Sequence, residues 1–113
     1  MHELSIAVQI IEIVHKHLPA DQNLSVKKIR LRVGEFTAII PESLRLCIDT
    51  ITRETADAGV ELEIIEIPAQ VKCRQCFSVS KIEPPYLICA SCGSQQVDII
   101  SGRELLVENI EAE

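Results

Sequence analysis

The chain has very few aromatic residues: no Trp, one Tyr and two Phe among 113 residues. Aromatic side chains bury the largest apolar areas, so the core of this chain must be built from Ile, Leu and Val instead. Hydrophobic residues still make up 47% of the sequence and charged residues 25%, which is typical of a globular protein. A chain of this length predicts one small domain, or a small domain that carries a subdomain.

Positive charge is scarce, and long apolar runs are absent. There are 11 Lys and Arg against 17 Asp and Glu, a net charge of −6. Such a chain repels polyanions on average, so we expect no nucleic-acid partner. No uninterrupted apolar run approaches the roughly 18 residues that span a bilayer. The N-terminus also lacks the basic flank and small-residue cleavage site of a secretory signal. We therefore expect a cytoplasmic protein that does not bind membranes.

The first half of the sequence predicts a helix followed by a strand. From Leu4 to Leu18 the polar residues recur at helical spacing in one narrow stripe, and Pro19 follows. This pattern predicts a helix buried over most of its circumference, packed on a sheet and, in a homodimer, on a second subunit. Charged and apolar residues alternate from Lys28 to Val33, which predicts a half-buried strand.

A second helix and two further strands are predicted later in the chain. Pro41 and Glu42 favour the first turn of a helix that Gly59 should stop. The apolar face of this helix is expected to comprise Leu44, Cys47, Ile48 and Ile51. Val60 to Ile67 predicts a strand, and Arg103 to Ile110 predicts a last strand in the same sheet.

The order strand, helix, strand predicts a right-handed crossover between two parallel strands. The segment between Pro68 and the last strand is richer in Cys, Ser, Gln and Pro than the rest of the chain. The predicted fold class is therefore α+β: two helices on a three-stranded mixed sheet, with an inserted four-cysteine, zinc-ribbon-like module.

Four of the five cysteines form two CxxC pairs, C73-RQ-C76 and C89-AS-C92. Each pair lets two thiolates from one tight turn reach one metal, and two turns complete a tetrahedron of sulfurs. This spacing predicts structural zinc held by Cys73, Cys76, Cys89 and Cys92. Iron in the same sulfur cage and a redox dithiol pair are the alternatives. Cys47, outside the pairs, is expected to be a small buried hydrophobe.

The first residues offer a second metal site. Met1 should be retained, because the enzymes that remove it generally need a small second residue, and His2 is not small. The Met1 amine, the amide nitrogen of His2 and its imidazole Nδ1 can then close two fused chelate rings in one plane. A planar nitrogen set suits Ni(II) or Cu(II), with Glu3, another backbone nitrogen, a distant side chain or water at the fourth corner. His15 and His17 are expected to be structural or interfacial rather than ligands.

The whole chain resembles the HypA/HybF family of nickel-insertion accessory proteins for hydrogenases. The resemblance rests on MHELSIA, LRVGE, IPESL, VELEI, the CxxC pairs with CGS, and SGRELLVENIE. Two differences affect turn geometry only: Phe77 follows the first pair where Gly is common, and Ala90 replaces a common Pro.

The resemblance implies a cytoplasmic nickel metallochaperone and no catalysis. It implies transient Ni(II) at His2, with the Met1 amine and Glu3 as further ligands, and structural zinc at the four paired cysteines. Residues 1–68 and 102–113 would form the nickel-binding domain, and residues 69–101 the zinc-binding domain. The implied partners are a nickel GTPase of the HypB type and the large subunit of [NiFe]-hydrogenase, and a homodimer is left open.

Two other functions compete with this one. A zinc-ribbon module for nucleic-acid binding or protein interaction would use the basic residues and two aromatics of the cysteine-rich segment. Residues 72–98 carry one excess positive charge, from Lys72, Arg74 and Lys81 against Glu83 and Asp98. This excess is too small, beside the net charge of −6 of the whole chain, for attraction to phosphates to dominate binding. A thiol oxidoreductase would need one exposed cysteine of low pKa, rather than four cysteines held by a metal.

Overall fold

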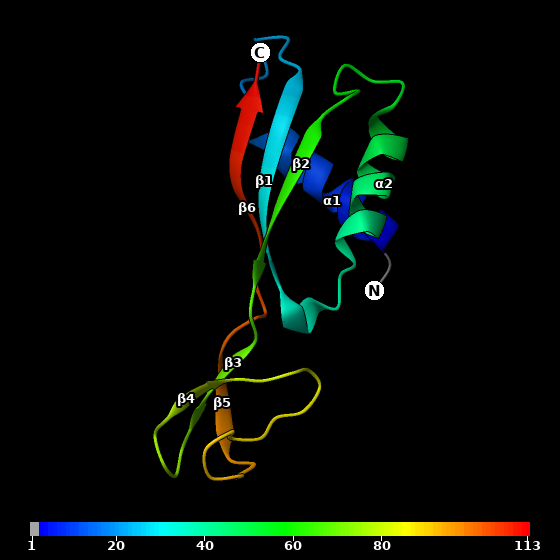
Figure 1. The fold of residues 1–113 in the computed structure, drawn as a ribbon. Helices are drawn as coiled ribbons and strands as arrows, with labels where there is room; N and C mark the ends of the chain where they lie inside the picture. The colour runs from blue at the N-terminus through cyan, green and yellow to red at the C-terminus, as the bar shows by residue number, and fades with distance from the viewer. Residues whose placement is uncertain (1–2) are drawn as a thin grey trace. The chain divides into compact units, whose positions relative to one another are not determined.

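The computed structural model describes residues 3–113, which form two α-helices, one short 3-10 helix and six strands (Figure 1). In chain order these are α1 (Glu3–Lys16), β1 (Val26–Gly34), η1 (Glu35–Thr37), α2 (Pro41–Thr52), β2 (Glu61–Ile67), β3 (Gln70–Cys73), β4 (Val79–Lys81), β5 (Val97–Ser101) and β6 (Leu105–Ala112). The chain groups into two compact units. The first comprises the chain up to Leu31, Ile39–Ile65 and Leu106–Glu113, and the second comprises Arg32–Ala38 and Glu66–Leu105.

The first unit contains the mixed sheet, in the order β2-β1-β6. Figure 1 shows β1 and β2 running in the same direction and β6 running against them, with both helices beside the sheet. The ion pairs of Lys28 with Glu63 (3.2 Å) and of Arg30 with Glu63 (3.2 Å) join β1 to β2. The α+β prediction, with a parallel pair of strands around the crossover helix, is confirmed.

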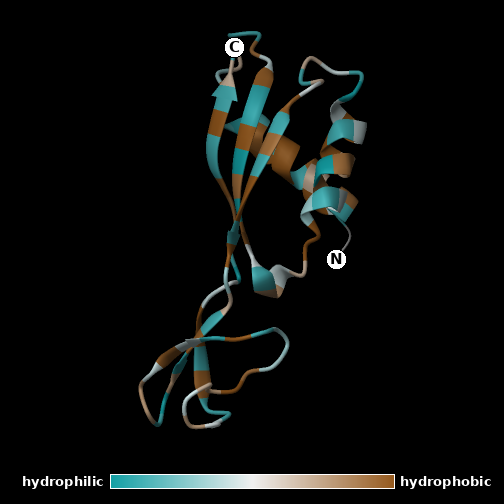
Figure 2. Ribbon diagram, viewed as in Figure 1, coloured by the Kyte–Doolittle hydropathy of each residue, from teal (hydrophilic) through white to brown (hydrophobic). Residues whose placement is uncertain are grey.

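Aliphatic side chains fill most of the core of the first unit, and Thr52 and Asp57 are its buried polar residues. Ile29 and Leu31 of β1 and Leu44 of α2 are completely buried. The teal and brown bands along the three strands in Figure 2 show the alternation that puts one face of the sheet against the helices. The other core residues of this unit are Ile6, Ala7, Ile10, Val14, Val26, Ile48, Val60 and Leu62.

Helix α1 is less buried than the sequence predicts. Its buried residues, Ile6, Ala7, Ile10 and Val14, form one face. Leu4, Val8 and Ile13 remain 52%, 41% and 42% exposed. The prediction of burial over most of the circumference is therefore wrong for the single chain, because one sheet and one helix can cover only one side of α1.

Helix α2 ends at Thr52, well before Gly59. At this end Thr55 makes two hydrogen bonds to the Thr52 carbonyl: its hydroxyl Oγ1 donates at 2.8 Å and its backbone amide donates at 2.9 Å. Such hydroxyls compete with helix continuation, so the chain leaves α2 in tight turns. Cys47, expected to be buried, is only half-buried.

A buried carboxylate links three segments of the first unit. Asp57, only 4% exposed, accepts the Val26 amide on Oδ1 at 2.8 Å and contacts His15 Nε2 through Oδ2 at 2.6 Å. It thereby joins the end of α1, the start of β1 and the turn after α2. His15 thus takes a structural role, as the sequence analysis expected.

The second unit contains an antiparallel sheet in the order β4-β3-β5. Val71 of β3 is completely buried and lies opposite Ser80 of β4 and Ile99 of β5. The sequence predicted an inserted zinc-ribbon-like module for this segment, without identifying the strands β3, β4 and β5. Neither helix described between residues 3 and 113 is long and apolar enough to cross a membrane.

Two backbone segments of the second unit lie in very close contact. The Gly34 amide donates to the Glu104 carbonyl and the Phe36 amide to the Gly102 carbonyl, both at 2.7 Å. A Cβ on Gly34 would lie 2.1 Å from the Gly102 carbonyl carbon, so only glycine fits there. The carboxylate of Glu35 accepts the Ala69 amide at 3.0 Å. This hydrogen bond ties Ala69, between β2 and β3, to the segment that contains Gly34 and Phe36.

Candidate metal centre

Each CxxC pair lies in a tight turn, and the two turns have the same backbone geometry. In the first, the Cys73 amide donates to the Ser78 carbonyl at 3.0 Å and the Phe77 amide to the Cys73 carbonyl at 3.1 Å. In the second, the Cys89 amide donates to the Ser94 carbonyl at 2.8 Å and the Gly93 amide to the Cys89 carbonyl at 2.9 Å. The fifth residue of each turn is left-handed, with φ of 61° at Phe77 and 77° at Gly93.

The two turns bring all four paired sulfurs together. The Sγ atoms of Cys73, Cys76, Cys89 and Cys92 lie within 4.8 Å of one another. Cys73 Sγ is 3.6 Å from Cys92 Sγ, and Cys76 Sγ is 3.5 Å from Cys89 Sγ. A zinc ion with Zn–S bonds of about 2.3 Å holds tetrahedral sulfurs about 3.8 Å apart, so the cluster has the size that zinc requires.

Backbone amides point at one sulfur in each turn. Cys73 Sγ accepts the amides of Gln75 and Cys76 at 3.3 and 3.4 Å, and Cys89 Sγ accepts the amide of Cys92 at 3.5 Å. Amide donors stabilise thiolate over thiol, and thiolate is the metal-binding form. These same two cysteines are the buried members of the cluster, at 1% and 2% exposure.

The pKa values of the cysteines move in opposite directions: those of Cys73 and Cys89 are lowered, and that of Cys92 is raised. Hydrogen bonds from Ser78 and from the Cys92 amide lower the pKa of Cys89 to about 5, and the Cys76 amide lowers that of Cys73. The Ser94 amide favours the Cys92 thiolate, but close contact with Cys73, burial and the other thiols raise its pKa to about 12. Four adjacent thiolates repel one another, and a divalent cation at the centre removes that repulsion.

Ser78 is a site residue that the sequence analysis missed. Its Oγ lies 3.0 Å from Cys76 Sγ and 3.5 Å from Cys89 Sγ, so one hydroxyl contacts sulfurs from both turns. The signal was present as a repeat, because C73-RQ-C76-F-S78 and C89-AS-C92-G-S94 both follow C-x-x-C-x-S. Groups that hydrogen-bond metal ligands orient them and tune their charge.

The N-terminal candidate site lies at the edge of the described residues. Met1 and His2, the predicted chelate, fall outside the residues that the structure describes. Glu3, the further ligand, is the first residue of α1 and is half-buried. His17, one residue beyond α1, is exposed. Within residues 3–113, the four cysteines are the group that could hold a metal ion.

The fold and the cluster define a small α+β protein with a closed four-cysteine metal site. A family profile described as "Hydrogenase/urease nickel incorporation, metallochaperone, hypA" matches residues 1–112. The chain belongs to this HypA family, which is described as a nickel-incorporation metallochaperone family.

Two curated relatives are similar along nearly the whole chain, and both are called hydrogenase maturation factor HypA. The relative from Desulfatibacillum aliphaticivorans is 45% identical over 98% of this chain and 86% of its own. The relative from Desulfosudis oleivorans is 44% identical over 98% of this chain and 97% of its own.

A solved structure of similar fold is the solution structure of the Ni metallochaperone HypA from Helicobacter pylori. It has a TM-score of 0.65 and 24% identity, and the match covers 98% of this chain and 97% of that one. At this identity the likeness concerns the fold.

Proposed function

We propose that the chain binds Ni(II) at its N-terminus and helps deliver it to the large subunit of [NiFe]-hydrogenase during maturation. The observation that carries this proposal is the family match over residues 1–112, which spans the MHE terminus and all four paired cysteines. Delivery involves a nickel GTPase of the HypB type, and the protein acts in the cytoplasm as a carrier without a catalytic step.

In this proposal the two metals have separate places. Residues 1–68 and 102–113 carry nickel through His2, the Met1 amine and Glu3. Residues 69–101 carry zinc through Cys73, Cys76, Cys89 and Cys92. The four-sulfur cage supports a structural role for zinc, because a closed tetrahedron has no open position for substrate.

Nickel titration of the zinc-loaded, untagged protein tests this division. We expect His2→Ala to abolish specific nickel binding and to leave zinc content and thermal stability unchanged. His17→Ala is the matched control, because it removes an exposed imidazole from the other end of the same segment. Loss of nickel binding in the His17 variant alone would overturn the assignment of His2, and so would a stoichiometric nickel site that survives His2→Ala.

The same purified proteins distinguish the competing function. A zinc-ribbon nucleic-acid binder would hold zinc alone and would bind oligonucleotides with a steep salt dependence. We expect instead bound nickel beside tightly held zinc, and no salt-sensitive retention of single- or double-stranded DNA.

A further inference from the structure

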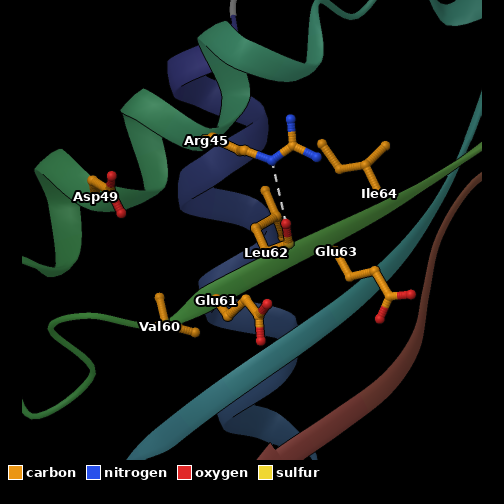
Figure 3. A pocket seen from close by; sticks show the side chains of 7 residues that line it. All are labelled: Arg45, Asp49, Val60, Glu61, Leu62, Glu63 and Ile64. Carbon is orange, nitrogen blue, oxygen red and sulfur yellow. Dashed lines mark hydrogen bonds between the residues drawn. The ribbon is translucent and has the colours of Figure 1, made fainter.

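Strand β2 is an edge of the mixed sheet, and its free side lies beside α2. In the strand order β2-β1-β6, the backbone of β1 is hydrogen-bonded to one side of β2. On the other side, Arg45 Nε of α2 donates to the Leu62 carbonyl at 3.3 Å (Figure 3). The Leu62 carbonyl therefore points away from β1. Because backbone groups alternate in direction along a strand, the N–H and C=O of Ile64 point the same way.

A groove runs along this edge. It has a volume of about 480 Å³ and lies between α2 and β2, with Arg45 and Asp49 on the helix side. Figure 3 shows Leu62 and Ile64 directed towards the helix, whereas Glu61 and Glu63 point to the other face of β2. Successive side chains of a strand point to opposite faces of a sheet. A strand added beside β2 would therefore place every second side chain next to Leu62 and Ile64, and the others next to Glu61 and Glu63.

The acidic side chains on the other face of β2 favour a basic occupant of this edge. Glu61 is exposed over 71% of its side chain, and its contact with Lys28 is 4.0 Å long. Hydrogen bonds from Arg30 and Lys28 hold the pKa of Glu63 below its usual range, so this carboxylate stays ionised. Asp49 lies on α2 with Arg45, and Glu63 already pairs with Lys28 and Arg30, so Glu61 is the acid along this edge that is most open to a new basic partner.

The sheet already contains a strand of the required chemistry. Strand β1, VKKIRLRVG, alternates basic and aliphatic residues, and Lys28 and Arg30 pair with the glutamates of β2. A second copy of β2 is a poor occupant, because antiparallel pairing would set Glu61 and Glu63 against the same residues of the other chain.

We propose that the free edge of β2 binds an extended segment of a partner protein in which Lys or Arg alternates with aliphatic residues. The segment adds to the sheet as a further strand. Its backbone pairs with Leu62 and Ile64, its basic side chains lie over Glu61 and Glu63, and its aliphatic side chains enter the groove. Arg45 covers the Leu62 carbonyl until the segment replaces it. This inference concerns no metal, so it stands or falls independently of nickel binding.

The test uses the zinc-loaded full chain without nickel, and two fluorescein-labelled peptides. The probe is Lys-Val-Lys-Val-Lys-Val-Lys-amide with fluorescein on its N-terminal amine, and the control peptide, labelled in the same way, has Glu in place of each Lys. We expect fluorescence anisotropy to show saturable binding of the Lys peptide, and binding of the Glu peptide at least about tenfold weaker. Amide hydrogen exchange should slow at Leu62 and Ile64 when the Lys peptide is added.

Two substitutions separate backbone pairing from general electrostatic attraction. Ile64→Pro removes an N–H that faces away from β1, which an edge strand tolerates, and should weaken binding at least about tenfold. Glu61→Gln should weaken it about two- to fivefold. Asp21→Asn is the control, because it removes one exposed acid from the α1–β1 connection and should leave binding unchanged.

Circular dichroism checks that each variant remains folded. If Ile64→Pro unfolds, the exchange footprint on the unsubstituted chain decides the question. Equal binding of both peptides, a footprint away from β2, or equal weakening by Asp21→Asn and Glu61→Gln would overturn the proposal. Dimers detected by sedimentation and abolished by Ile64→Pro would overturn it too, because the edge would then bind a second copy.

Discussion

At the scale of single residues, the two metal-binding turns differ at their left-handed position. Gly93 adopts φ of 77° without a Cβ, whereas Phe77, a residue that is 70% exposed, adopts 61°. A left-handed conformation costs a non-glycine residue about 1–2 kcal/mol. The exposed ring contributes little burial in return, so the first turn holds strain that the second lacks.

We therefore predict opposite effects of two substitutions on the zinc-loaded protein. Gly93→Ala should lower the free energy of unfolding by about 1 kcal/mol, because it introduces this strain. Phe77→Gly should leave it unchanged or raise it by up to about 1 kcal/mol, since relief of strain is partly offset by the flexibility of glycine in the unfolded chain. Thermal unfolding of both variants checks this, and a destabilised Phe77→Gly beside a neutral Gly93→Ala would contradict it.

A second residue-scale prediction concerns the buried sulfur of Cys73. Cys73→Ala should remove zinc and unfold the inserted module, because the three remaining thiolates lose most of the binding free energy that folds it. Zinc analysis and amide exchange over residues 70–101 measure both effects. Cys47→Ala, which removes a half-buried thiol outside the cluster, should keep full zinc content and native protection. Retained zinc and protection in Cys73→Ala would contradict the account.

At the scale of elements, Asp57 joins α1, β1 and the turn after α2. Asp57→Ala should lower the free energy of unfolding by about 2 kcal/mol, because it leaves the buried Val26 amide without its acceptor. Asp57→Asn keeps a carbonyl oxygen for that amide and should cost less. Asp49→Ala, an exposed acid on α2, should change it by less than about 0.5 kcal/mol. Urea unfolding compares the three, and equal stability of the Asp57→Ala and Asp49→Ala variants would contradict this role.

The elements also show what a sequence can and cannot predict. Alternation gave β1 and β2 to within two residues, because these strands bury one face and the period of two is clear. Strands β3, β4 and β5 were missed: Gln70–Cys73 has four residues and Val79–Lys81 three, too few for a clear period. The end of α2 was misplaced because local hydroxyl bonds at Thr55, rather than Gly59, end the helix.

The same limits apply to the candidate sites. The four cysteines were predictable because CxxC spacing fixes which sulfurs can share a metal, and the structure brings all four together. The C-x-x-C-x-S repeat marks Ser78 as part of its own turn, but the repeat does not predict that its hydroxyl also contacts Cys89 Sγ of the other turn. The contacts of Asp57 could not be predicted from local patterns, because its partners His15 and Val26 lie 42 and 31 residues away.

At the scale of the whole molecule, the two metal sites proposed for this chain have opposite character. The cysteine cluster combines two buried and two exposed cysteines with backbone donors to the buried pair, which suits permanent retention. The proposed nickel site uses the chain terminus, where amine, amide and imidazole must all lose protons to bind. Nickel affinity should therefore fall as pH drops below about 6.5, while zinc is still held. Acid sensitivity of this kind suits a carrier, which must release its cargo.

The most direct test is a nickel titration of two zinc-loaded proteins, one with a free Met1 amine and one with Gly-Ser-Gly placed ahead of it. The chelate needs the Met1 amine as a terminal nitrogen, so the account predicts a specific nickel site in the first protein and its loss in the second, with equal zinc content in both. A side-chain site built from His15 or His17 would be indifferent to the extension. Equal nickel affinity in the two proteins would contradict the amino-terminal chelate and, with it, the mechanism proposed for this chain.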